Sequence, residues 1–206
     1  EYGIILLSGN YTANTSKGSW ATQNGRKSVF QGIAHTLYLP RHTSFEIQAD
    51  SDILDLGIGW CETDQDFEPV FKTPDQADIE IRGGDNATRQ INSLIQPGFP
   101  CHRLVAVEVY TPSGNWSSFP AHKHDERILS ESGEVLEARL EETYFYKIDK
   151  AQGYAIQQIY TTDRSLDEIA VARNNDVVLV PKGYHPVAAG HGYNVYYLNF
   201  LTGSDQ

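Results

Sequence analysis

Residues 114–125, GNWSSFPAHKHD, hold the pattern around which the rest of the chain is organised. Their last part places His122 and His124 two positions apart. In an extended strand such residues project from the same face, so both imidazoles can reach one point. Imidazole is a common ligand of zinc, iron, nickel and copper. The pair predicts half of a metal site, although two exposed histidines in a loop would give the same sequence.

Two later segments supply further candidate ligands. Residues 140–146, LEETYFY, are an acidic pair that leads into an aromatic strand. Residues 176–186, DVVLVPKGYHP, are an apolar strand followed by a Pro-x-Gly turn and His185. Three histidines and one carboxylate form a mixed nitrogen and oxygen ligand set, which suits zinc and also iron, manganese or nickel.

A His-x-His, a carboxylate that opens a later strand and a histidine after a Pro-x-Gly turn resemble, in this order, the metal signature of the cupin family. The resemblance implies a small antiparallel barrel with the ligands inside it. The chain is also similar, more distantly, to the 4-deoxy-hexosulose-uronate ketol-isomerase family, in which a His-x-His and a Glu-x-Tyr-Phe-Tyr strand bind zinc. The matching string here starts at Glu142, not Glu141. The implied metal ligands are His122, His124, Glu142 and His185.

A closer resemblance covers most of the chain. Residues 107–124, 160–168 and 177–189 are similar to the 5-deoxy-glucuronate isomerase family of myo-inositol catabolism, as are RKSVF at 26–30 and RQIN at 89–92. This similarity implies an aldose–ketose isomerase that converts 5-deoxy-D-glucuronate to 5-dehydro-2-deoxy-D-gluconate. It also implies a divalent metal cofactor, with zinc expected first and manganese, iron or nickel as alternatives.

Composition limits the class of protein. The 206 residues carry a net charge of −11, which argues against a nucleic-acid partner because phosphate binding needs a basic surface. No apolar run approaches the ~18 residues that would span a bilayer, so no membrane association is expected. Cys61 and Cys101 are far apart and indicate free thiols in a reducing compartment, which predicts a cytoplasmic protein.

Short apolar segments separated by Gly-rich and Asn-rich turns predict an all-β fold. We expect a bicupin of two antiparallel β-barrel or jelly-roll halves with little helix. Residues 1–95 form an N-terminal half without metal, because no His-x-His precedes residue 122, and residues 96–206 form the metal-binding half. Residues 52–77 are acidic and irregular, which favours a solvated connection. The charged insertion at 125–140 predicts a hairpin or a short helix, with a lid as one role.

The isomerisation needs an acid or base that moves a proton between C2 and C1 of the sugar. The first candidates for this catalytic role are Tyr144, His191 and Lys182. Glu141, Glu142 and Tyr184 stay open as alternatives.

The carboxylate of a sugar acid needs a cation, because guanidinium binds carboxylate through two parallel hydrogen bonds. Candidate cations are Arg103, Arg164, Arg173 and Lys182. Trp116 offers a flat face to a sugar, and Tyr184 is a further candidate for substrate binding.

Three other functions fit the same pattern. A related uronate ketol-isomerase would use the same ligand set on another sugar acid. An iron cupin dioxygenase would use the open positions of its metal to bind oxygen. A sugar-binding cupin without enzymatic activity would bind its ligand without turnover. All of these functions imply a small-molecule partner. Assembly into a homo-oligomer stays open as a further expectation.

Overall fold

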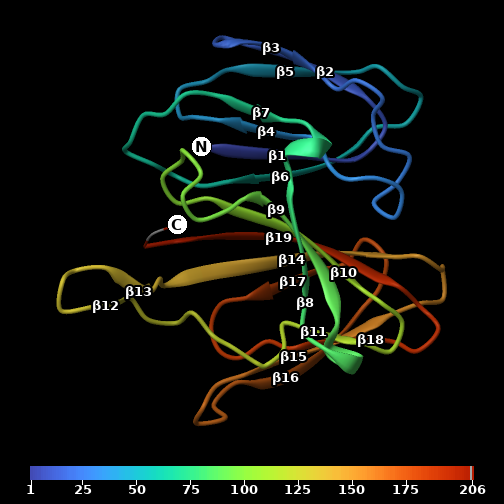
Figure 1. Ribbon diagram of the computed structural model, residues 1–206, viewed down its shortest axis with the longest axis vertical. Helices are drawn as coiled ribbons and strands as arrows, with labels where there is room; N and C mark the ends of the chain where they lie inside the picture. Colours follow the sequence, from blue (N-terminus) through green and yellow to red (C-terminus); the bar gives the residue numbers. More distant parts are fainter. Residues whose placement is uncertain (205) are drawn as a thin grey trace.

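The computed structural model describes residues 1–204 and 206, and these are folded almost entirely as β-strands (Figure 1). The elements are β1 (Tyr2–Ser8), β2 (Tyr11–Thr15), β3 (Gly18–Ala21), β4 (Thr36–Leu39), β5 (Phe45–Ala49), β6 (Asp55–Trp60), β7 (Val70–Lys72), η1 (Pro74–Gln76), β8 (Asp78–Arg82), η2 (Asp85–Ala87), β9 (Arg89–Ile95), β10 (Val105–Thr111), β11 (Trp116–Ser117), β12 (Ile128–Leu129), β13 (Val135–Glu137), β14 (Leu140–Ile148), β15 (Ala155–Tyr160), β16 (Asp167–Ala172), β17 (Val177–Val180), β18 (Val187–Ala189) and β19 (Val195–Gly203).

The all-β antiparallel fold predicted from the sequence is confirmed. The helical elements of the described chain are two 3₁₀ turns, η1 and η2. None of its helices is long and apolar enough to cross a membrane. The strands form sheets ordered β3-β2-β5, β6-β1-β4-β7, β17-β14-β19-β10-β9-β8 and β11-β18-β15-β16, with β12-β13 as a separate hairpin.

These sheets lie in layers with an apolar cluster between each pair of neighbours (Figure 1). Strand β1 shows why, because its run of buried apolar residues serves two clusters. Ile4 and Leu6 pack with the three-stranded sheet, while Ile5 and Leu7 pack toward the six-stranded sheet. A strand covered on both faces is apolar throughout rather than alternating.

Strand β6 corrects the expectation that residues 52–77 are a solvated connection. This segment contains β6 and β7, which are the two edge strands of the first four-stranded sheet. Gly57 and Gly59 of β6 lie against Leu198 and Phe200 of β19, and a Cβ at either glycine would overlap these side chains. The sequence does not reveal this strand easily, because the face of β6 that packs against β19 consists of glycines without side chains.

The division into halves at residue 95 stays a prediction. Strands β8 and β9, which precede that residue, pair with each other, and β9 pairs with β10. Both therefore belong to the six-stranded sheet that also carries β14 and β19. The arrangement brings residues 78–95 beside the strands that hold the candidate ligands.

A buried ion pair joins the first layers to the six-stranded sheet. Arg26 donates from Nη1 to Glu108 Oε1 of β10 at 2.5 Å, and neither side chain is exposed. Tyr196 and Asn92 donate to the same carboxylate at 3.0 and 3.1 Å. Arg26 also donates to the backbone oxygens of Leu6 and Val29. Buried charge is tolerated here because both partners are hydrogen-bonded.

Glu108→Gln should therefore destabilise the protein by about 3–5 kcal/mol, because it leaves the Arg26 charge buried without its counterion. Urea unfolding monitored by fluorescence measures the loss. The matched control is Asp66→Asn, which breaks the exposed Arg41–Asp66 pair and should cause a much smaller loss, because water screens exposed charges. Equal losses for the two variants would contradict this role of the buried pair.

Candidate metal centre

Four side chains from three segments face one another at one end of the six-stranded sheet. The ligand atoms of His122, His124 and His185 all lie within 4.8 Å of one another. Glu142 of β14 adds its Oε2 atom, which lies 3.1 Å from the Nε2 atoms of both His124 and His185. Glu141, by contrast, is exposed, because alternation along β14 turns it to the other face.

Hydrogen bonds to backbone carbonyls orient the imidazoles. The Nδ1 atom of His124 lies 2.8 Å from Leu140 O, and that of His185 lies 2.8 Å from Gly183 O. The Nδ1 atom of His122 lies 3.4 Å from Pro120 O. When Nδ1–H donates to a carbonyl, Nε2 keeps a lone pair, which is the usual arrangement of a metal-binding histidine.

The electrostatics of the cluster call for positive charge at its centre. Burial raises the pKa of Glu142, but interactions with His124 and His185 outweigh it and hold the pKa below its usual range. Burial lowers the pKa of His124, but Glu142 outweighs it and raises the pKa. His185 is fully buried, and its Nε2 lies 3.1 Å from Glu142 Oε2 without the alignment of a hydrogen bond. A divalent cation would satisfy these groups without protons, so the donor set fits a metal ion.

Two contacts hold the segments that carry the ligands. Leu140 N donates to His124 O at 3.0 Å, which with the Nδ1 contact closes the 125–139 insertion beside Glu142. The insertion itself is the β12–β13 hairpin, one of the two forms expected from the sequence. Asp125 Oδ1 accepts from Gly183 N at 2.6 Å and so ties the His122–His124 segment to the turn before His185.

The turn before His185 needs glycine. Gly183 has φ +92°, which L side chains rarely adopt, and a Cβ there would lie 2.5 Å from Tyr160 O. Tyr160 and Tyr184 exchange backbone hydrogen bonds at 2.8 and 2.9 Å on either side of this contact. The Pro-x-Gly turn therefore fixes the position from which His185 enters the site.

A cavity of about 280 Å³ opens beside the cluster, and His122, Glu142 and Tyr144 line it. The six-stranded sheet supplies most of the remaining wall through inward residues of β8, β9, β10 and β19. Pockets for drug-sized ligands measure roughly 300–1,000 Å³, so this one suits a small metabolite.

Buried hydroxyl groups form a chain along the cavity. The Ser118 hydroxyl lies 2.9 Å from the Tyr144 hydroxyl and 3.4 Å from that of Tyr197. Burial raises the pKa of Tyr144 well above its usual range and that of Tyr197 to about 12. Both phenols are therefore neutral at physiological pH and able to donate hydrogen bonds.

The other residues predicted from the sequence lie outside this cavity. Lys182, His191, Arg164 and Arg173 are exposed. Arg103 lies in a separate hollow with Arg139 and Glu141. The Tyr184 ring stacks on Tyr160, and Trp116 is partly exposed against Phe119.

Sequence reasoning missed several polar side chains of the cavity, and three of them are charged or contact Glu142. Arg82 and Arg89 come from β8 and β9, and Asn199 comes from β19, where it donates to Glu142 Oε1. The alternation of residues 79–82 and the 89–92 segment were visible in the sequence. The pairing of β8 with β9 and of β9 with β10, which brings them to the site, was not.

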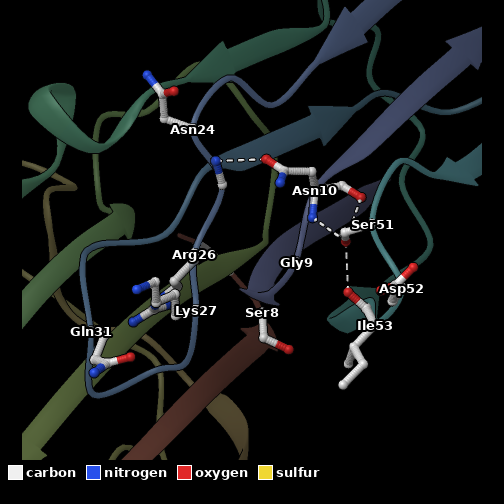
Figure 2. Close-up of a pocket in the computed structure, with 11 residues that line it drawn as sticks. Ser8, Gly9, Asn10, Asn24, Arg26, Lys27, Gln31, Ser51, Asp52 and Ile53 are labelled. Carbon is white, nitrogen blue, oxygen red and sulfur yellow. Dashed lines mark hydrogen bonds between the residues drawn. The ribbon is translucent and has the colours of Figure 1, made fainter.

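A larger hollow of about 640 Å³ lies in the first half of the chain (Figure 2). Two of its polar side chains, Asn10 and Ser51, hold loops together. Asn10 Oδ1 accepts from Gly25 N at 2.6 Å, and the Ser51 hydroxyl donates to Ile53 O at 2.7 Å. Arg26 at its edge is bound to Glu108. The size of a hollow therefore does not identify the functional site, because the histidine cluster lies beside the smaller cavity.

Removing the Asp125–Gly183 contact should weaken metal binding. We expect Asp125→Ala to lower zinc affinity about 10- to 100-fold, since groups that orient metal ligands typically contribute this much. Asp125→Asn is the matched control, because its amide oxygen can still accept from Gly183 N. Competition with a chromophoric chelator measures both affinities. An unchanged affinity in Asp125→Ala would show that the contact does not position His185.

Comparison with known proteins places these features in a family. The model of the KduI/IolB family matches residues 1–206. The chain is 40% identical over 204 residues to a protein of Geobacillus thermodenitrificans named 5-deoxy-glucuronate isomerase, covering 98% of this chain and 72% of that one. It is 36% identical over 205 residues to the protein of the same name from Bacillus subtilis strain 168, covering 98% and 73%.

Solved structures agree with the sequence comparison. The fold is similar to that of an IolB-like protein from Salmonella typhimurium LT2, with a TM-score of 0.87, 36% identity and coverage of 98% of this chain and 75% of that one. A putative glyoxylate-induced protein from Pseudomonas aeruginosa shares the fold alone, with a TM-score of 0.59, 10% identity and coverage of 100% and 66%. On the full-length family match and the identity to its curated members, this chain belongs to the KduI/IolB family.

Proposed function

We propose that this chain is a metal-dependent aldose–ketose isomerase that converts 5-deoxy-D-glucuronate to 5-dehydro-2-deoxy-D-gluconate. The names of its relatives support the reaction and substrate. The observation that carries the chemistry is the cluster of three histidines around Glu142 beside a cavity of metabolite size. Such a donor set, open to a cavity on one side, is typical of a catalytic rather than a structural metal site.

The proposed metal ligands are His122, His124, His185 and Glu142. Zinc is the proposed ion, because imidazole nitrogens with one carboxylate are among its usual ligands, and manganese, iron or nickel would also fit. A bound divalent ion would act as a Lewis acid that polarises the sugar carbonyl and so acidifies the neighbouring C–H bond.

Tyr144 is the proposed proton-transfer residue at the sugar oxygens. Of Tyr144, His191 and Lys182, it is the one that lines the cavity, and its hydroxyl lies on the Ser118 chain. An aldose–ketose conversion moves one proton from C2 to C1 and another from O2 to O1. A neutral phenol beside Glu142 can donate to the second of these transfers.

We also propose a cytoplasmic location. Cys61 and Cys101 are both free. Free thiols are the usual state of cysteines in reducing compartments.

Metal-loaded protein should convert 5-deoxy-D-glucuronate, followed by proton NMR, and the chelator-treated protein should be inactive until zinc is restored. His122→Ala should lower both zinc affinity and turnover, the latter at least about 100-fold, because a lost ligand weakens the Lewis acid. His42→Asn is the control, since His42 is exposed, at φ +58°, and asparagine tolerates this backbone conformation.

The same assay separates the other functions. Absence of turnover in metal-loaded protein would overturn the proposed isomerase. Oxygen uptake by the iron-loaded protein would indicate a dioxygenase. Ligand binding without turnover would indicate a sugar-binding protein, and turnover of another uronate alone would indicate a related ketol-isomerase.

Tyr144→Phe should lower kcat by about 10²- to 10⁴-fold, the usual contribution of a positioned acid or base. Metal content should stay at the wild-type level, because the phenylalanine keeps the ring that packs against His185. Tyr154→Phe is the control, because Tyr154 is partly exposed and packs against Tyr193 away from the cavity. A normal kcat in Tyr144→Phe would remove the phenol from the proposed mechanism.

A further inference from the structure

Two arginines face each other across neighbouring strands on the wall of the cavity. Arg82 of β8 and Arg89 of β9 are direct partners in the antiparallel ladder, so their side chains share one face. Both line the same cavity as Glu142 and His122. Strand β9 is separated from β14 by β10 and β19, so the arginines and Glu142 approach the cavity from different strands of one sheet.

Arg89 is buried without a counterion. The residue as a whole is 6% exposed, and its buried Nε has no hydrogen-bond partner. Its Nη1 donates to Ala87 O at 3.1 Å, which is a neutral acceptor. Within residues 1–204 and 206, no carboxylate forms an ion pair with it, because nearby Glu80 is bound to Arg82 at 2.6 Å.

This arrangement is costly for the protein alone. A buried charge without a partner costs free energy. Arg82, directly opposite in the ladder, has Glu80 as its counterion, whereas Arg89 has none. The Arg26–Glu108 pair shows how the same chain compensates a buried guanidinium when the role is structural. An anion that enters the cavity would give Arg89 the counterion that it lacks.

We propose that Arg89, assisted by Arg82, binds the carboxylate of the sugar acid and so sets the specificity of the site for uronates. The inference rests on the proposed function for the identity of the substrate. Guanidinium can hold a carboxylate through two parallel hydrogen bonds.

The position of the pair explains how one small cavity can select a substrate with two functional ends. The carboxylate is bound at the β8–β9 side, which directs the carbonyl end of the acyclic sugar toward the histidine cluster and Tyr144. A neutral hexose would leave Arg89 buried and unpaired, so the site would reject it. Arg89 is thus a specificity-determining residue, and Arg82 assists it from a more exposed position.

Binding of an inert acid tests the proposal independently of turnover. The probe is 5-deoxy-D-glucuronate reduced at C1 to the alcohol, which keeps the carboxylate but cannot isomerise. We expect calorimetry on zinc-loaded protein to show binding that is about 100-fold weaker in Arg89→Met and partly restored in Arg89→Lys. Arg82→Met should show a smaller loss. Zinc content should be unchanged in each variant.

Arg173→Met is the matched control, because it removes the same charge from an exposed arginine outside the cavity. It should bind the probe like the wild type. A second readout compares kcat/KM for 5-deoxy-D-glucuronate with that for 5-deoxy-D-glucose, whose C6 is a hydroxymethyl group. Arg89→Met should lower the ratio by at least tenfold, mainly through the KM of the acid.

The two hypotheses fail in different ways. If Arg89→Met binds the reduced acid as tightly as the wild type, the carboxylate role is overturned, whatever the turnover. An equal loss of activity on the acid and the neutral sugar would also overturn it, because it would indicate a merely structural effect. If the wild type binds the reduced acid through Arg89 but does not convert 5-deoxy-D-glucuronate, the proposed isomerase fails and the carboxylate site stands.

Discussion

The candidate site depends on one electrostatic constraint, which is the approach of a buried carboxylate to two imidazole nitrogens. Glu142 Oε2 lies 3.1 Å from the Nε2 atoms of both His124 and His185. Backbone carbonyls occupy the Nδ1 atoms of these rings, so the Nε2 lone pairs point inward. Such a group is stable only with positive charge at its centre, supplied by protons or by a metal ion. The surrounding loops are arranged to keep this convergence.

Two buried guanidinium groups in this chain differ in how their positive charge is compensated. Arg26 is fully buried and ion-paired with Glu108, and it joins the first layers of the fold to the six-stranded sheet. Arg89 is nearly as buried but has a neutral carbonyl as its acceptor and another arginine opposite it. The first charge has its counterion within the protein, whereas the second would gain one from the proposed anion. Unsatisfied charge at a cavity wall is therefore a functional signal.

The layered fold explains why the site lies where it does. Strands β1 and β19 are apolar on both faces because each is covered from both sides, and this fixes the six-stranded sheet in the middle of the molecule (Figure 1). The cavity lies on the face of the six-stranded sheet that is turned away from β1. Its inward residues come from β8, β9, β10, β14 and β19, so one rigid sheet carries both the arginines and Glu142. A rigid scaffold of this kind holds reacting groups in place.

The sequence by itself determined the all-β class and the local geometry of the site. Period-two alternation turned Glu142 and Tyr144 to one face and Glu141 to the other, and the turn at Gly183 marked the entry of His185. These features depend on neighbours along the chain. For the same reason the sequence left the 125–140 insertion open between a hairpin and a helix, and offered Arg103, Arg164, Arg173 and Lys182 as equal candidates for the carboxylate.

Only the tertiary structure decided which cations reach the cavity. Arg82 and Arg89 arrive there because β9 pairs with β10, and β10 with β19, which follows them by more than a hundred residues. Strand pairing between distant segments is set by packing and register and leaves little trace in any one segment. The same reason hid β6, whose glycines matter because β19 lies against them. Local pattern thus determined what each segment is, and long-range pairing determined what each side chain faces.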